Sequence, residues 1–332
     1  MNQLVVVILI SVALLLPAPA SGQTIKLATL APVGSPWHGI VRDMAADWTK
    51  VTNGKIQVRI YAGGIAGDEP DMVRKLRVGQ LQAALLTGAG LSEITGAIQA
   101  LQMPMMISSD AELDFLLERM APKLETLLQA RGFKALNWGD AGWVRFFTQT
   151  PVVTPDDLKP LKLFAWAGET AYLEAWKDAG FNPVLLPANE IHTGLQAGLI
   201  NAFVAPPVAA LAFQWFGLAK NMTDLRWAPL LGATVMTNAA FNEIPNEAKP
   251  LLVKSAANAS QRFRNEIRGL SIDAVEVMKK HGLVVHPVPP AVALQWENRA
   301  RSGYAKIIGR VVPPNMFAEV ERLRGEYRAA LK

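Results

Sequence analysis

The side chains that could carry out chemistry in this chain are few and widely separated. The sequence has no cysteine and only four histidines, which are His38, His192, His281 and His286. No two of these histidines have the spacing of metal ligands on one helix face. We also find no G-x-S-x-G nucleophile elbow and no phosphate-binding loop with its lysine. These observations predict a protein that is not an enzyme and that has no cofactor and no metal site.

An acidic cluster at Asp68, Glu69 and Asp71 is the closest approach to a cation site. The cluster comes directly before a short helical pattern. Carboxylates are favourable at this position because the helix dipole is positive at the N-terminus. We therefore interpret the cluster as the start of a helix, with a metal site as the alternative.

Aromatic side chains are concentrated in one segment in the middle of the chain. They are Trp138, Trp143, Phe146, Phe147, Phe164 and Trp166. We interpret Phe146 and Phe147 as core residues, because aromatic side chains on buried strands normally pack inside. For Trp143, Phe164 and Trp166, contact with a ligand and packing in the core both remain open.

Alternating strands and helices would have to position these aromatic residues. Residues 25–29 predict a strand, and Ser35 followed by Pro36 predicts the start of a helix. Residues 56–60 alternate between apolar and polar side chains, as a half-buried strand does. The same alternation of elements continues to about Ala239, and it predicts an α/β protein with parallel sheets flanked by helices.

Two longer helices are also predicted. Ser109 and Glu112 form a capping-box pattern that opens a helix ending near Ala130. Residues 245–280 form a long and almost unbroken helical pattern, which residues 281–282 (His-Gly) terminate. No stretch resembles a flexible linker, so two domains would have to be joined by ordered strands or by a long helix.

The N-terminus has the pattern of a secretory signal peptide. Residues 4–16 are almost entirely apolar, but the run is shorter than the roughly 20 residues of a membrane-spanning helix. An A-x-A pattern follows at residues 18–20. We predict a signal peptide over residues 1–22, cleaved between Ala20 and Gln23, with an uncleaved anchor as the alternative.

Length, charge and composition narrow the class of protein. A chain of 332 residues can form two domains with full hydrophobic cores, and 51% hydrophobic residues with 18% charged residues are typical of globular proteins. The net charge of +5 comes from basic residues scattered among acidic ones. Because there is no basic block, we expect no nucleic-acid partner.

Several segments, taken in order, resemble the substrate-binding proteins of tripartite ATP-independent periplasmic (TRAP) transporters, the DctP-like family. The segments are residues 27–36 (LATLAPVGSP), 52–55 (TNGK), 61–64 (YAGG), 67–69 (GDE), 76–81 (LRVGQL), 140–151 (DAGWVRFFTQTP), 156–162 (DDLKPLK) and 190–201 (EIHTGLQAGLIN). Each motif alone is weak, but the ordered set extends over nearly all of the chain after the predicted signal peptide.

The resemblance implies a periplasmic binding protein fold, with two α/β lobes, a hinge, a long bridging helix and a ligand cleft between the lobes. We expect residues 23–141 and 231–270 to form lobe I, and residues 142–230 and 271–332 to form lobe II. The family implies a periplasmic receptor that binds a small organic ligand and delivers it to the membrane subunits of a TRAP permease.

Three positions depart from the family pattern. Members of the family that bind dicarboxylates or sialate have arginines where this chain has Phe164 and Val144, and an asparagine where it has Ala205. An arginine fork is the strongest ordinary way to hold a carboxylate in a dry cleft. These departures predict a cleft for a mainly apolar or aromatic solute. The residues expected to line it are Leu30, Ala31, Thr87, Gly88, Gly90, Trp143, Val144, Arg145, Phe164, Trp166 and Ala205.

Other interpretations remain open. An organic acid could be held by Arg145, Lys162 or Arg42 in a rearranged site, although Arg145 is next to Val144 and neighbours on a strand point to opposite faces. The apolar side chains could also fill the cleft, so that nothing small binds. A periplasmic sensor or partner-binding protein with the same fold, serving no permease, is a further alternative.

Overall fold

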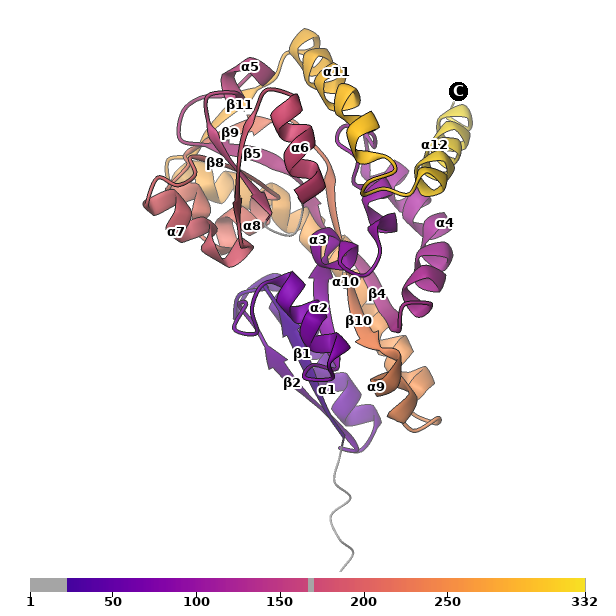
Figure 1. Ribbon diagram of the computed structural model, residues 1–332. Coiled ribbons are helices and arrows are strands. Elements are labelled where there is room, and N and C mark those ends of the chain that lie inside the picture. The colour runs from indigo at the N-terminus through magenta and orange to yellow at the C-terminus, as the bar shows by residue number, and fades with distance from the viewer. Residues whose placement is uncertain (1–22, 167–169, 332) are drawn as a thin grey trace, which may run out of the picture.

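The computed structural model describes residues 23–166 and 170–331, arranged as two α/β lobes (Figure 1). The predicted signal peptide, residues 1–22, lies outside the described residues. Within the described ranges, no helix combines the length and the apolar character needed to cross a membrane.

The first lobe is built on a five-stranded sheet. Its strands are β1 (Gln23–Thr29), β2 (Ile56–Tyr61), β3 (Ala83–Thr87), β4 (Phe133–Trp143) and β10 (Pro229–Thr237). They are ordered β2-β1-β3-β10-β4. The strands β1, β2 and β3 are parallel, whereas β10 pairs antiparallel with both β3 and β4.

The second lobe is built on a six-stranded sheet. Its strands are β5 (Arg145–Thr148), β6 (Lys162–Trp166), β7 (Asn182–Leu186), β8 (Ala202–Ala205), β9 (Asn221–Asp224) and β11 (Val284–Pro287). They are ordered β11-β9-β5-β8-β6-β7. Here β6 pairs parallel with β7 and β8, and β5 pairs antiparallel with β8 and β9.

The prediction of parallel sheets is therefore wrong for one strand in each lobe, which is β10 in the first lobe and β5 in the second. The chain crosses between the lobes twice in extended form, once from β4 to β5 through Val144 and once from β9 to β10. A strand that arrives from the other lobe has no crossover helix to reverse its direction, so β5 and β10 enter their sheets antiparallel. Both crossing segments form the hinge between the lobes.

Helices cover the sheets on their outer faces. They are α1 (Pro36–Val51), α2 (Glu69–Arg77), α3 (Gly88–Ser92), α4 (Asp110–Gln129), α5 (Pro155–Leu158), α6 (Thr170–Asp178), α7 (Ile191–Gln196), α8 (Pro207–Ala212), α9 (Asn238–Glu243), α10 (Lys249–Lys280), α11 (Pro290–Ile307) and α12 (Pro314–Ala329), with short 3-10 turns η1 (Gly96–Leu101), η2 (Ala188–Glu190) and η3 (Trp215–Gly217).

Two predicted helix starts are present. The Ser35 hydroxyl accepts a hydrogen bond from the backbone N–H of His38 at the start of α1. The Ser109 hydroxyl accepts one from the backbone N–H of Glu112 at the start of α4. The carboxylate of Glu112 does not complete the predicted box, because it accepts from the backbone of Ser108 instead and pairs with Arg328.

Helix α10 joins the two lobes. It has 32 residues, starts four residues later than the pattern predicted, and ends at the predicted place, with His281 as its C-cap. It packs against α1 and β4 in the first lobe and against α8 in the second. Helix α11 packs on α6 in the second lobe, whereas α12 lies beside α4 in the first (Figure 1). The lobe boundaries stay a prediction; α12 was assigned to the second lobe with residues 271–332, and it packs against α4 and η1 of the first.

Candidate ligand-binding site

A cavity of about 290 Å³ lies between the two lobes. The loop after β1 and the end of β3 form one wall, and the ends of β6 and β8 form the other. Loops at the carboxyl ends of strands are the usual place for a ligand in α/β folds. The first hinge crossing contributes Val144 to the cavity wall, and the second contributes residues 227–229.

The cavity wall is mainly apolar and aromatic. Its ring side chains are Trp37, Phe164, Trp166, Tyr172, Trp176, Phe213, Trp215, Trp227 and Phe263. The side chain of Phe164 is 5% exposed, and its ring centroid lies 6.3 Å from that of Trp166. Trp176 stacks on Trp227 with 5.6 Å between ring centroids.

Among the described residues of the cavity wall, the only charged side chains are Glu69 and Asp140, and none is an arginine or a lysine. Both oxygens of Glu69 are already engaged, because they accept hydrogen bonds of 2.7 Å from the backbone N–H and hydroxyl of Thr87 and from the backbone N–H of Gly90. Burial raises the pKa of Glu69 to about 7 in spite of these bonds, which oppose the rise.

Hydrogen bonds across the cleft connect the two lobes. Asp68, the N-cap of α2 in the first lobe, accepts from the indole N–H of Trp166 at 2.9 Å and from the backbone N–H of Ala188 at 3.1 Å, both in the second lobe. The Tyr172 hydroxyl donates to Gln99 Oε1 at 3.1 Å, again between lobes. The lobes are therefore held in contact beside the cavity.

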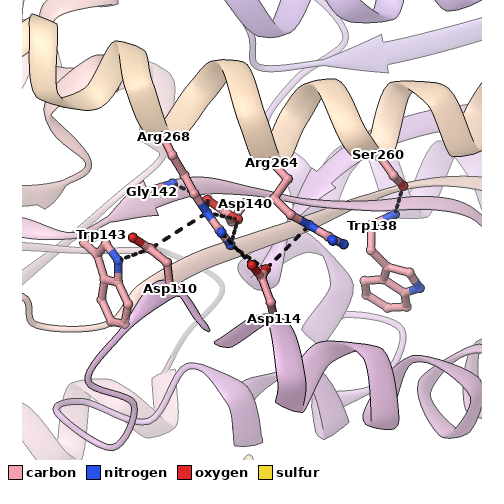
Figure 2. Close-up of polar contacts among 9 residues, drawn as sticks. All are labelled: Asp110, Asp114, Trp138, Asp140, Gly142, Trp143, Ser260, Arg264 and Arg268. Atoms are coloured by element: carbon pink, nitrogen blue, oxygen red, sulfur yellow. Dashed lines mark hydrogen bonds and ion pairs between the residues drawn. The ribbon is translucent and has the colours of Figure 1, made fainter. Parts of the chain in front are cut away.

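An ionic cluster around the buried Asp140 lies beside the hinge, and Figure 2 shows it. Arg268 extends from α10 and donates to both oxygens of Asp114 on α4, at 2.8 and 2.9 Å. It also donates to Asp140 on β4, at 2.8 and 3.1 Å. Burial lowers the pKa of Arg268, but these two carboxylates outweigh burial and hold the pKa above its ordinary value. We call Asp114, Asp140 and Arg268 the hinge cluster.

A second pocket, of about 480 Å³, lies between the hinge cluster and the second lobe. Residues that line it include Gly142, Trp143, Arg145, Arg226, Ser271 and Lys279. We call it the hinge pocket. Gly142 has φ of +92°, and a Cβ atom there would lie 2.8 Å from the Ser271 hydroxyl, so only glycine fits without a shift.

Most of the predicted site residues lie on the cavity wall. They are Leu30, Ala31, Thr87, Val144, Phe164, Trp166 and Ala205. Gly88 and Gly90 do not line the cavity; they pack closely against Gln102 and Glu69, respectively.

Trp143 and Arg145 line the hinge pocket rather than the cavity. The indole N–H of Trp143 donates to Asp110 at 2.7 Å, and Arg145 lies 3.6 Å from Asp224. Because neighbours along an extended strand point to opposite sides, Val144 faces the cavity and its two neighbours face away.

Sequence reasoning missed several wall residues, above all Glu69 and Trp227. Glu69 was noted as part of a helix start, and its burial could not be read from the sequence. Trp227 lies on the second hinge crossing, which has no sequence signal of its own. Within the described ranges, no group of three or more histidine, aspartate or glutamate side chains has the geometry of a metal site.

Comparison with known proteins supplies the family context. The bacterial extracellular solute-binding proteins, family 7, match residues 27–310. The Escherichia coli periplasmic protein that binds 2,3-diketo-L-gulonate is 26% identical over 70% of this chain and 72% of its own length. The C4-dicarboxylate-binding periplasmic protein of Rhodobacter capsulatus is 22% identical over 97% and 94%, respectively.

The fold has a counterpart among solved structures. The crystal structure of a TRAP periplasmic solute-binding protein from Xanthobacter autotrophicus, with bound β-D-galacturonate, superposes with a TM-score of 0.84. The alignment covers 91% of this chain and 99% of that chain, at 20% sequence identity. At this identity the likeness demonstrates the two-lobe fold with its long bridging helix.

Proposed function

The chain belongs to family 7 of the bacterial extracellular solute-binding proteins, the periplasmic receptors of TRAP transporters, and from this premise we propose that its cleft binds a small organic solute with a largely apolar or aromatic body. It is a non-enzymatic binding protein. We further infer that it delivers the solute to the membrane subunits of a TRAP permease, the partner that its family implies.

The observation that carries the proposal is the chemistry of the cavity wall. Phe164, Val144 and Ala205 line the cavity, and no described wall residue is an arginine or a lysine. A carboxylate buried there without a charged partner would lose several kcal/mol of solvation free energy. By contrast, burying about 200 Å² of apolar ligand surface contributes about 5 kcal/mol before the cost of association.

A second candidate is an organic acid. The names of the E. coli and Rhodobacter relatives specify acids as their ligands, and the ligand in the Xanthobacter structure is also an acid. Taken alone, these comparisons favour an acid over an apolar solute. In this chain Arg145 lines the hinge pocket, so it does not take the place of the family arginine in the present arrangement. An acid would need neutral donors on the wall, such as Thr29 and Asn189.

Native mass spectrometry of the protein purified from periplasm tests the proposal by identifying any ligand that co-purifies. The proposal expects a neutral or mainly apolar compound that is released when the protein is unfolded. Recovery of a hydrophilic dicarboxylate or sugar acid would reject the apolar solute and establish the second candidate. If nothing co-purifies, titration of the same sample with the two ligand classes decides between them.

A further inference from the structure

The hinge pocket contains two buried polar groups that have no partner. Nη1 of Arg145 and the hydroxyl of Ser271 are both buried, and neither has a hydrogen-bond partner within the part of the chain that the structure describes. Both residues line the same pocket. Buried polar groups in proteins are almost always bonded, so two unpartnered groups in one pocket point to a bound group that supplies the bonds.

The guanidinium of Arg145 is poorly neutralised by the protein itself. Among the residues that the structure describes, Arg145 forms one ion pair, from Nε to Asp224 at 3.6 Å, which is longer than a hydrogen bond, and the Asp224 side chain is 55% exposed. Burial lowers the pKa of Arg145 to about 10, which still leaves the group protonated at neutral pH. A buried guanidinium with an unpartnered N–H group lowers the stability of the protein unless a bound anion accepts a hydrogen bond from it.

The surrounding charges leave room for an anion. Arg226 lies over the ring of Trp143, 5.4 Å from its centroid, and Lys279 also lines the pocket. The carboxylates that line the pocket are Asp110, Asp224 and Glu276. Asp224 is the distant, mostly exposed partner of Arg145, and the other two have partners of their own. Asp110 accepts from Trp143, and Glu276 pairs with Lys279 at 3.0 Å. Arg268, on the same wall, is held by the two carboxylates of the hinge cluster. Arg145 is therefore the buried cation with free capacity, whereas Arg226 is exposed to solvent.

We propose that the hinge pocket is a second binding site, which takes a small oxyanion between Nη1 of Arg145 and the hydroxyl of Ser271. The pocket encloses about 480 Å³, which is ample for a phosphate, a sulfate or a small carboxylate. This site is separate from the cavity between the lobes and does not depend on which solute the cavity binds.

Isothermal titration calorimetry with inorganic phosphate, and separately with sulfate and acetate, tests the site at constant ionic strength set with chloride. The wild type should bind at least one of these anions at a single site. Arg145→Gln should weaken that binding by roughly tenfold or more, because one charge-assisted fork is lost. Ser271→Ala should weaken it less. Arg59→Gln, the same change at an exposed residue of β2, should leave it unchanged.

Thermal unfolding of the same variants separates loss of the site from loss of the fold. In buffer without the anion, Arg145→Gln should unfold at the same temperature as the wild type or higher, because an uncompensated buried charge is removed. Adding the anion should raise the unfolding temperature of the wild type and of Arg59→Gln, raise that of Ser271→Ala by a smaller amount, and leave that of Arg145→Gln unchanged. No binding of any of the three anions by the wild type, or equal binding by Arg145→Gln, would overturn the proposal. If Arg145→Gln fails to fold, the result for Ser271→Ala decides.

Discussion

The hinge cluster lies in the first lobe, beside the crossing at Val144, and shares Asp140 with the wall of the cavity between the lobes. The chemistry of the two regions is nevertheless opposite. The cavity wall is apolar and aromatic, and its one carboxylate outside the hinge cluster, Glu69, is fully hydrogen-bonded. The hinge cluster holds one arginine against two carboxylates, with the Asp140 side chain only 4% exposed. The chain thus concentrates buried charge where the lobes are joined and keeps cations away from the place where a solute would bind.

The absence of arginines at positions 144 and 164 is therefore not a general absence of buried charge in this chain. The segment from β4 to β5 presents Val144 to the cavity, and it also places Asp140 in the hinge cluster and Arg145 in the hinge pocket. The apolar cavity is therefore a local property of the wall.

Removing the cation of the hinge cluster should have the largest effect. Arg268→Ala leaves the buried Asp140 without its cationic partner and with only the backbone N–H of Gly142 as a donor, so the free energy of unfolding should fall by about 3–5 kcal/mol. Arg322→Ala is the matched control, because Arg322 also pairs with two glutamates but is 52% exposed. The control should change stability by less than about 1 kcal/mol. Urea denaturation measures both, and equal small losses would mean that the cluster does not stabilise the hinge.

A charge placed in the apolar wall should have the next largest effect, on binding. Phe164→Arg adds a cation that loses its water when the lobes close, so affinity for an apolar solute should fall by about 2–4 kcal/mol. Leu294→Arg, at a position 59% exposed on α11, adds the same charge away from the cavity and should not change affinity. Calorimetry with the co-purified solute checks both variants. An unchanged affinity in Phe164→Arg would remove Phe164 from the site.

Weakening the contacts across the cleft should have a smaller effect. Asp68→Asn replaces a charged acceptor for Trp166 and Ala188 by a neutral one, so closure should become less favourable by about 1.5–3 kcal/mol and solute affinity should fall accordingly. Asp71→Asn, on the same helix at a 41% exposed side chain, serves as control. Small-angle scattering of the solute-free protein should show a larger radius of gyration for Asp68→Asn alone. Identical scattering from both variants would mean that Asp68 does not hold the lobes together.

The pH dependence of stability should report the burial of Glu69. Its pKa in the folded protein is about 7, above the ordinary value of 4.5, so between these values the folded state keeps a proton that the unfolded state has lost. Stability should therefore decline as pH rises through this window, by up to about 1.4 kcal/mol per pH unit, and level off above it. The decline should be absent in Glu69→Gln. Parallel pH profiles for the two proteins would contradict the raised pKa.

The sequence permits prediction of the architecture and of part of the cavity wall. Local sequence patterns predicted the alternating elements, the caps at Ser35 and Ser109 and the long helix before His281. The structure contains all of them, because such features depend on residues that are close in sequence. The resemblance to the DctP-like family also drew attention to Phe164, Val144 and Ala205, which the fold brings to one cavity. In each case a short-range signal determines the outcome.

Features that depend on long-range contacts could not be predicted. The sheets were expected to be parallel, but β5 and β10 are antiparallel because of the hinge crossings. Trp143 was expected in the cleft, yet its indole bonds to Asp110, which is 33 residues earlier in the chain. The burial of Glu69 and the pairing of Arg268 with Asp140 also depend on elements that are distant in sequence.

Calorimetric titration of the wild type with a matched pair of ligands shows whether the cavity prefers a neutral aromatic solute to a carboxylate. Benzamide and benzoate have nearly the same shape, but only benzoate carries a charge that the cavity would have to hold. The account predicts that binding of the neutral aromatic is at least about tenfold tighter, since a buried carboxylate finds no cation on the described wall. Tighter binding of benzoate, or tight binding of succinate or galacturonate with no response to benzamide, would contradict it and establish the protein as an organic-acid receptor.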